Sequence, residues 1–277
     1  MQSMCELLGL SFNQTINPSF SFEGLLAGSD INPHGWGLGF YSDNCRSAML
    51  FKEPMIGCCS QLAEFLFSYR ELRSRTFLCH IRKASKGVMS YDNTHPFSRF
   101  YNGLEMLFAH NGSLHRQKRL NRLTYRPAGR TDSERAFCYL LSQLRKCKIK
   151  PISRGKYLGY SADDFRAILE ILVDINVQGD GAFNAVFTDG VHLFCYRDID
   201  SARPLFFLKR RYPFSQTVLR DSDLQVNLNL EKGRTEEGYI VASTPLSSED
   251  WASFECGQLI VFKNGEVVAD IGIDDGY

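Results

Sequence analysis

The sequence lacks the features that direct a chain into a membrane or onto a polyanion. No apolar run approaches the roughly 20 residues needed to span a bilayer, and no charged segment followed by an apolar one opens the chain. The 32 Lys and Arg residues nearly balance 31 Asp and Glu, so a net charge of +1 gives no general attraction to nucleic acid or to anionic lipid. We therefore expect a cytoplasmic protein that binds neither nucleic acid nor membrane.

The cysteine spacings typical of disulfide frameworks and of metal sites are missing as well. The nine cysteines are an odd number and include no C-x-x-C pair. Scattered cysteines of this kind indicate reduced thiols rather than a disulfide framework or a zinc site, so we expect no metal and no cofactor. Internal repeats, low-complexity tracts and obvious linkers are also absent, and we expect residues 1–277 to form a single domain.

The patterns that are present predict both strands and helices. Strands are expected at 6–12, 76–81, 104–109 and 239–243, and Asp189-Gly190 and Asn264-Gly265 are typical two-residue hairpin turns. Helices are expected near 22–26, over 62–70, behind Thr131 and from Ser161. The second is expected to be amphipathic, because its apolar residues Leu62, Phe65, Leu66 and Tyr69 follow helical spacing. Thr131 and Glu134 have the form of a capping box, in which Glu134 reaches back to the N-cap. This mixture predicts an α+β sandwich.

Two segments allow more than one interpretation. Glycines alternate in the strand expected at 34–41, which permits close approach of another backbone or of a ligand, or simply a tightly bent packing strand. Six basic residues lie between 116 and 130, and few aromatic residues are interleaved with them. A solvated surface is therefore favoured over a phosphate or nucleic-acid site. The basic residues are Arg116, Lys118, Arg119, Arg122, Arg126 and Arg130.

Cys5 is the candidate around which a catalytic site can be built. If the residues before it were removed, Cys5 would carry a thiol and a free α-amine, and the amine can act as base for the thiol. An α-amine titrates near roughly 7.7–8.0, so part of it is neutral at physiological pH. A small buried apolar group is the alternative interpretation of any single cysteine.

Two strand ends and one helix start carry side chains suited to acyl transfer from an amide. Asn111 and Gly112 offer a side-chain amide and a backbone N–H for an oxyanion, although an ordinary Asn-Gly turn is the alternative. Arg82 can fork onto a carboxylate. Asp132 can pair with an ammonium, although its position near a helix N-terminus explains it equally well. A cationic and an anionic anchor together suit the zwitterionic end of an α-amino acid.

Five motifs then occur in one order: a cysteine behind a methionine, His80-Ile81-Arg82, Asn93-Thr94-His95-Pro96-Phe97, His110-Asn111-Gly112 and Thr131-Asp132-Ser133-Glu134. In this order and spacing the sequence resembles the class II glutamine amidotransferases, which are N-terminal nucleophile hydrolases. The residues within these motifs are similar to those of the stand-alone YafJ-type branch. That branch also contains the γ-glutamyl hydrolase of ergothioneine biosynthesis. The resemblance is close over residues 4–140 and loose beyond.

The resemblance implies a four-layer αββα sandwich, with two antiparallel sheets between helical layers. It implies that Cys5 is the nucleophile, with its own amine as base. Asn111 and Gly112 would then form the oxyanion hole.

The same resemblance supplies a substrate clamp. Arg82, assisted by Ser85, would hold the substrate α-carboxylate, and Asp132 would hold the α-amine. His95 is grouped with these substrate-binding residues, and both His95 and His110 are expected to shape loops rather than to transfer protons.

Exposure of Cys5 requires an explanation, because four residues precede it. An aminopeptidase that trims only before small residues should not remove Met1 ahead of Gln2. We take Met4 as the working start, so that residues 1–4 are absent from the active form. A separate processing step, or an inactive chain, are the alternatives.

The expected activity is hydrolysis of a γ-glutamyl amide, either glutamine or a larger γ-glutamyl compound, through a thioester on Cys5. The products would be glutamate and either ammonia or an amine, and ammonia would pass to a separate ammonia-accepting synthase subunit. A non-catalytic glutamine-binding regulatory subunit with a blocked N-terminus is the alternative. A Cys-His hydrolase built on Cys79 is weaker, because a thiol within an apolar strand is expected to be inert.

Overall fold

The computed structural model describes residues 5–26, 33–42, 46–82, 88–154, 157–200, 203–214, 216–219 and 225–273. Strand β1 (Glu6–Ile16) lies within a seven-stranded antiparallel sheet of order β15-β11-β14-β1-β4-β2-β3. The other strands of this first sheet are β15 (Ala252–Ser253), β11 (Phe206–Arg210), β14 (Gly238–Ala242), β4 (Ser74–Ile81), β2 (Trp36–Tyr41) and β3 (Ala48–Glu53).

A second antiparallel sheet has six strands in the order β17-β16-β10-β9-β6-β5. Its strands are β17 (Glu266–Ile271), β16 (Leu259–Lys263), β10 (His192–Tyr196), β9 (Phe183–Thr188), β6 (Leu104–Gly112) and β5 (Phe97–Tyr101). Two small hairpins lie outside both sheets: β7 (Ile152–Arg154) with β8 (Tyr157–Gly159), and β12 (Gln216–Val218) with β13 (Gln225–Asn227).

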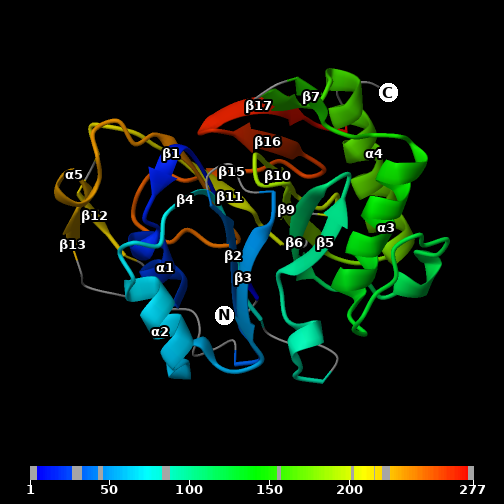
Figure 1. Cartoon of the computed structure of the whole chain (residues 1–277), viewed down its shortest axis with the longest axis horizontal. Helices are drawn as coiled ribbons and strands as arrows, with labels where there is room; N and C mark the ends of the chain where they lie inside the picture. The colour runs from blue at the N-terminus through cyan, green and yellow to red at the C-terminus, as the bar shows by residue number, and fades with distance from the viewer. Residues whose placement is uncertain are drawn as a thin grey trace.

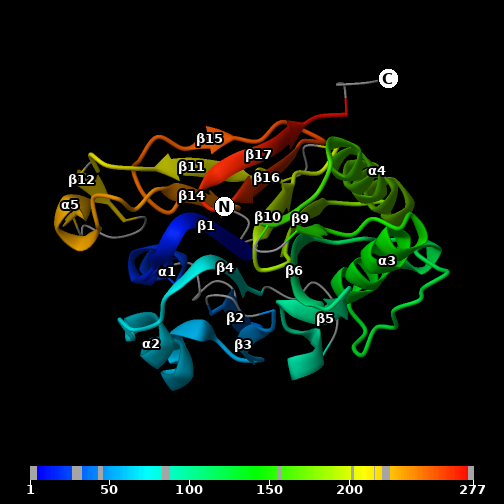
Figure 2. The ribbon, with the colours of Figure 1, turned by 45° about the horizontal axis from the view of Figure 1, so that its top comes forward.

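Helices cover the outer faces of both sheets (Figures 1 and 2). The helices are α1 (Ser19–Leu26), α2 (Gln61–Ser68), α3 (Asp132–Lys146), α4 (Ala162–Gly179) and the short α5 (Leu228–Glu231). One apolar core joins the first sheet to α1 and α2, and another joins the second sheet to α3 and α4. A third core lies between the two sheets. Three cores separate four layers, which is the predicted αββα sandwich.

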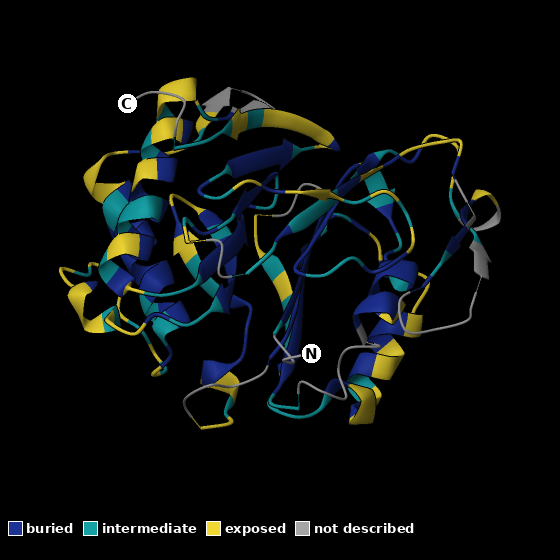
Figure 3. Ribbon diagram, turned by 180° about the vertical axis from the view of Figure 1, so that it is seen from behind, coloured by how far each residue is buried: buried dark blue, intermediate teal, exposed yellow. Residues whose placement is uncertain are grey.

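The alternation of side chains along β1 builds two of these cores at once. Leu8 and Leu10 pack into the core beneath α1 and α2, whereas Leu7 points into the core between the sheets. Successive side chains of a strand point to opposite faces, so an apolar strand in the middle of a sandwich is buried on both sides. Figure 3 shows the same burial, with buried sheets inside and exposed residues on the outer faces of the helices.

The expected hairpins form, with one shift in position. Asn264 and Gly265 join β16 to β17, and both have the positive φ angles (50° and 79°) that an Asn-Gly turn supplies. Between β9 and β10 the chain reverses one residue later than expected, at Gly190 and Val191. There Asp189 N donates to His192 O at 3.4 Å.

The apolar face assigned to the helix over 62–70 is partly wrong. Helix α2 ends at Ser68 and buries Ala63, Leu66 and Phe67. The ring of Phe65 is instead 57% exposed and stacks on Tyr69, with ring centroids 5.3 Å apart.

The capping box expected at α3 forms only in half. Thr131 Oγ1 accepts a hydrogen bond from Glu134 N at 3.2 Å, as an N-cap does. The Glu134 carboxylate does not return to Thr131. It accepts from Ala128 N at 2.9 Å and Gly129 N at 2.7 Å, and it pairs with Arg99 at 2.5 Å. The Glu134 carboxylate therefore binds the backbone of the loop before α3, and not the N-cap residue that the capping-box pattern predicted.

None of the helices in the described part of the chain combines the length and the apolar character needed to cross a membrane.

Candidate active site

The predicted site residues lie where strand ends of the two sheets meet. Cys5 directly precedes β1 in the first sheet, and Asn111 is the penultimate residue of β6 in the second. The side-chain amide of Asn111 donates from Nδ2 to the carbonyl oxygen of Cys5 at 2.7 Å. Cys5 is partly exposed, whereas Asn111 is buried. The structure therefore joins the candidate nucleophile and the candidate oxyanion donor across 106 positions of sequence.

Gly112 occupies a place that no side chain can share. It is the last residue of β6 and lies opposite Phe183 in β9, so Asn111 and Gly112 are paired strand residues rather than an isolated turn. A Cβ on Gly112 would lie 1.9 Å from Ala182 O and 2.5 Å from His110 Nε2. Only glycine permits this approach of two backbones.

Arg82 interacts electrostatically with both Cys5 and Asp132. The Arg82 side chain is 4% exposed, and burial lowers the pKa of its guanidinium, while negative charge on Cys5 and on Asp132 opposes this shift. Asp132 is the first residue of α3, and its Oδ2 accepts from Leu114 N at 2.7 Å. Arg82 is thus a buried cation that interacts with both Cys5 and the fixed carboxylate of Asp132.

The backbone of Arg82 is fixed by His34 and Gly35, which open the glycine-rich stretch just before β2. Arg82 N donates to Gly35 O at 2.7 Å, and His34 N donates to Arg82 O at 3.1 Å. These two bonds hold Arg82 beyond the end of β4. The glycine stretch of the sequence therefore positions a candidate substrate anchor through its backbone.

Two buried histidine rings, tilted by 38° to each other, are in contact near Arg82. The imidazole centroids of His80 and His95 are 4.2 Å apart, and the ring centroids of His95 and Phe97 are 4.6 Å apart in an edge-to-face arrangement. Burial lowers the pKa of His80 to about 3 and that of His95 well below its ordinary value. Within the described residues, no ring nitrogen of either histidine has a hydrogen-bond partner. Both rings are therefore neutral at physiological pH, and these contacts suit the expected role of His95 in shaping its loop.

His110 is held by hydrogen bonds at both ring nitrogens. Its Nδ1 lies 2.9 Å from Ser133 Oγ, and its Nε2 lies 3.1 Å from Ala182 O. Burial lowers the pKa of His110, and the negative charge of Asp132 opposes this shift. His110 thus ties β6 to the first turn of α3 and to the chain before β9.

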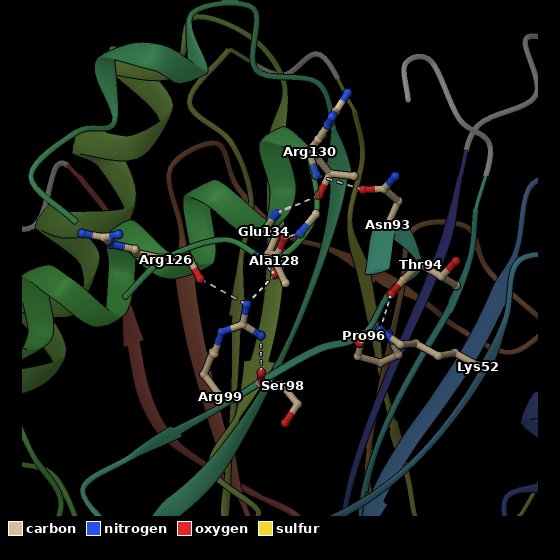
Figure 4. A network of polar contacts seen from close by, with 12 residues as sticks. Lys52, Asn93, Thr94, Pro96, Ser98, Arg99, Arg126, Ala128, Arg130 and Glu134 are labelled. Atoms are coloured by element: carbon tan, nitrogen blue, oxygen red, sulfur yellow. Dashed lines mark hydrogen bonds and ion pairs between the residues drawn. The ribbon is translucent and has the colours of Figure 1, made fainter. Parts of the chain in front are cut away.

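A buried lysine holds the loop that carries His95. Lys52 Nζ donates to Thr94 O at 2.9 Å and to Pro96 O at 3.4 Å, on either side of His95 (Figure 4). The same Nζ lies 4.4 Å from the ring centroid of Tyr91. Burial lowers the pKa of Lys52 to about 8.

The neighbouring loop is tied to the start of α3. Asn93 Oδ1 accepts from Arg130 N at 3.0 Å, and a Cβ on Gly129 would lie 2.6 Å from the same oxygen (Figure 4). The Asn-Thr-His-Pro-Phe motif therefore lies between Lys52 on one side and the Thr-Asp-Ser-Glu motif on the other.

The six basic side chains between 116 and 130 are solvent-exposed, as expected for a solvated loop.

Arg203 belongs to the site, although no local pattern in the sequence points to it. Its Nη1 donates to Asn111 Oδ1 at 2.5 Å across 92 positions of sequence. The connection between β10 and β11 carries two basic residues, Arg197 and Arg203, and nothing in the sequence distinguishes one from the other.

Other candidates receive less support from the geometry. Ser85 and residues 1–4 lie outside the described residues. Cys79 is fully buried, and burial raises the pKa of its thiol, which is the opposite of what a thiolate nucleophile needs. In the described ranges, no three His, Cys, Asp or Glu side chains are grouped as metal ligands.

Comparison with known proteins places this geometry in a family. Residues 4–274 match the family model for glutamine amidotransferases class-II. The chain is 44% identical over 265 residues to an uncharacterised protein of Methanocaldococcus jannaschii, MJ1515, covering 96% of this chain and 71% of that protein. It is 34% identical over 276 residues to YafJ of Escherichia coli, which carries a provisional glutamine amidotransferase assignment, covering 96% of this chain and 100% of YafJ.

Solved structures show the same fold. A crystal structure of a protein from Pseudomonas aeruginosa predicted to be a glutamine amidotransferase has a TM-score of 0.64 and 29% identity, covering 96% of this chain and 100% of that one. The PRPP amidotransferase of B. subtilis has a TM-score of 0.61 at 16% identity, covering 98% of this chain and 50% of that one. The match over residues 4–274 and the identity to YafJ lead to one conclusion: the chain belongs to the class-II glutamine amidotransferase family.

Proposed function

We propose that this protein hydrolyses γ-glutamyl amides through a thioester on Cys5. The observation that carries the proposal is the hydrogen bond of 2.7 Å from Asn111 Nδ2 to Cys5 O. It is supported by the electrostatic interaction of Arg82 with both Cys5 and Asp132. Acyl transfer from an α-amino acid amide requires a nucleophile, a donor for the oxyanion, and one positive and one negative side chain that hold the substrate.

In the proposed reaction, the α-amine of Cys5 takes the thiol proton and the sulfur attacks the γ-carbonyl carbon. The oxyanion is stabilised by an N–H of the Asn111 amide and by the backbone N–H of Gly112. When the tetrahedral species collapses, the C–N bond breaks and the leaving nitrogen takes the proton from the Cys5 ammonium. Water, deprotonated by the same amine, then cleaves the thioester, releasing glutamate and restoring the thiol.

The clamp selects the γ-glutamyl end of the substrate. Arg82 holds the α-carboxylate, with Ser85 assisting, and Asp132 holds the α-ammonium. Neutral His80, His95 and His110 do not serve as bases in this scheme, because the α-amine already performs that role.

The leaving group is ammonia from glutamine or the amine of a larger γ-glutamyl compound. The second option follows from the sequence resemblance to the γ-glutamyl hydrolase of ergothioneine biosynthesis. For glutamine, a separate synthase subunit that consumes ammonia is part of the proposal.

The test uses protein that begins at Cys5, made by specific cleavage of an N-terminal extension. Glutamine, γ-glutamyl peptides and γ-glutamylamines are offered, with asparagine as a control that is one methylene shorter. We expect glutamate release from at least one γ-glutamyl amide, a glutamyl adduct on Cys5 by mass spectrometry, and no turnover of asparagine.

Matched cysteine variants complete the test. Cys5→Ala is expected to abolish turnover, and Cys147→Ala, which removes an exposed thiol at the end of α3, is expected to retain it. Absence of turnover with every γ-glutamyl amide, or full activity of Cys5→Ala, would reject the proposal. Glutamine binding without turnover by protein that retains residues 1–4 would favour the regulatory subunit instead.

A further inference from the structure

The Asn111 amide is held at both ends by partners of opposite hydrogen-bonding character. At its oxygen end, Oδ1 accepts from Arg203 Nη1 at 2.5 Å; at its nitrogen end, Nδ2 donates to Cys5 O at 2.7 Å. A guanidinium has only donors and a carbonyl oxygen only accepts. Turning the amide over would place N–H against N–H and oxygen against oxygen. The two partners therefore allow one orientation, in which the N–H groups face Cys5.

A buried asparagine fixes the segment that carries Arg203. Asn184 in β9 lies directly opposite Asn111 in β6 and is fully buried. Its Nδ2 donates to Arg203 O at 3.2 Å and to Pro204 O at 3.1 Å, and its Oδ1 accepts from Asp198 N at 3.0 Å. The connection between β10 and β11 is thereby bound to the strand beside Asn111, and the Arg203 guanidinium starts from a fixed backbone.

We propose that Arg203 is a positioning residue for the acyl-transfer step, an inference that rests on the proposed function. It keeps the Asn111 amide in the orientation that presents N–H toward the reacting carbonyl. A cation at Oδ1 also draws electron density from the amide and makes its N–H groups stronger donors. Arg203 acts only through Asn111, so it is not assigned any contact with substrate.

This role differs from that of a second carboxylate anchor. An arginine that bound the substrate carboxylate would affect substrate binding in the ground state and raise KM. An arginine that orients an oxyanion donor affects the transition state and lowers kcat, because the oxyanion exists only there. The two roles therefore predict opposite divisions between kcat and KM.

The test measures Arg203→Ala in protein that begins at Cys5, alone and combined with Asn111→Ala. We expect kcat to fall by about 10- to 100-fold with KM changed by less than about threefold, because a misplaced donor costs rate rather than binding. In the Asn111→Ala background the Arg203 substitution should cost less than about twofold, since residues that act as one unit are not additive. Added guanidinium ion should restore part of the rate to Arg203→Ala.

The matched control is Arg197→Ala in the same connection. Arg197 Nη1 donates to Ser253 Oγ at 3.3 Å and to the Phe254 carbonyl, not to Asn111. We expect Arg197→Ala to keep kcat, even where it lowers the thermal midpoint. Unchanged kcat in Arg203→Ala, a rise in KM alone, or losses that multiply with Asn111→Ala would overturn the positioning role.

A spectroscopic readout separates this inference from the proposed function. In 15N-asparagine-labelled protein, the side-chain NH2 signals of Asn111 should shift in Arg203→Ala and stay in place in Arg197→Ala. If the wild-type protein turned over no γ-glutamyl amide, the proposed function would be rejected. The Asn111 NH2 signals would still show whether Arg203 orients the Asn111 amide. Signals that do not move in Arg203→Ala reject that role whatever the activity.

Discussion

Gly37 lies directly against the carbonyl oxygen of His95. A Cβ on Gly37 would be 2.0 Å from that oxygen and 2.9 Å from the Cβ of Lys52. Gly37 in β2 therefore admits another backbone, the first of the interpretations that the sequence allowed. The backbone admitted is the Asn-Thr-His-Pro-Phe loop, so the glycine stretch and the histidine motif form one packed unit.

This contact predicts a steep penalty for a single methyl group. Gly37→Ala should lower the free energy of unfolding by about 2 kcal/mol or more, because the colliding atom is backbone and cannot rotate away. Gly39→Ala is the matched control, since its Cβ would meet Leu107 Cδ1 at 2.4 Å, the end of a flexible side chain. Urea unfolding of both variants measures the difference. Equal losses would contradict the backbone contact.

The buried histidine pair predicts that stability falls in acid. Burial lowers the pKa of His80 to about 3, whereas an unfolded histidine titrates near 6.5. Between these pH values His80 is protonated in the unfolded chain but not in the folded protein. The free energy of unfolding therefore declines as pH falls from 6.5 toward 3, by up to about 1.4 kcal/mol per pH unit.

His80→Phe keeps an aromatic ring against His95 and removes the titrating group. Its stability should decline less steeply with acid than that of the wild-type protein, although His95 still titrates. Urea midpoints from about pH 7 down to about pH 4 give the two slopes. Parallel slopes would assign the acid sensitivity to other groups.

Lys52 predicts that stability rises in base. Burial lowers the pKa of Lys52 to about 8, below the roughly 10.4 of an unfolded lysine. Between these values the unfolded state binds more protons, so this group increases stability as pH rises. Lys52→Met should remove that increase, and it should destabilise the protein by about 1–3 kcal/mol because two carbonyls lose their donor.

The measurement is the difference in unfolding free energy between wild type and Lys52→Met from about pH 7 to about pH 10. The difference cancels the titration of tyrosines and other lysines common to both proteins. A difference that stays constant over this range would show that the Lys52 pKa is not depressed.

Asp132 allows a charge-only substitution. Its Oδ2 accepts from Leu114 N, and the side-chain amide introduced by Asp132→Asn retains one oxygen for that bond. If the carboxylate holds the substrate ammonium, the variant should raise KM by about 10- to 100-fold, the value of one charge-assisted hydrogen bond. Steady-state kinetics with the best γ-glutamyl amide measures this. An unchanged KM would show that Asp132 has only a structural role at the start of α3.

The sequence by itself determined what depends on local order. Short runs of strand-favouring apolar residues located β4 and β6, the Asn264-Gly265 pair located a hairpin, and Thr131 marked the start of α3. These features arise from periodicity and turn chemistry within a few residues. The order of five motifs also pointed to the family that the comparisons confirm.

Tertiary structure decided the features that depend on which segments meet. The Glu134 carboxylate caps the preceding loop instead of its own helix, and Phe65 lies exposed although its helical spacing suggested burial. The contact between the His80 and His95 rings and the bond from Arg203 to Asn111 join segments that share no local pattern. Such contacts follow from the packing of two sheets, because strand ends that are distant in sequence converge only when the sandwich closes.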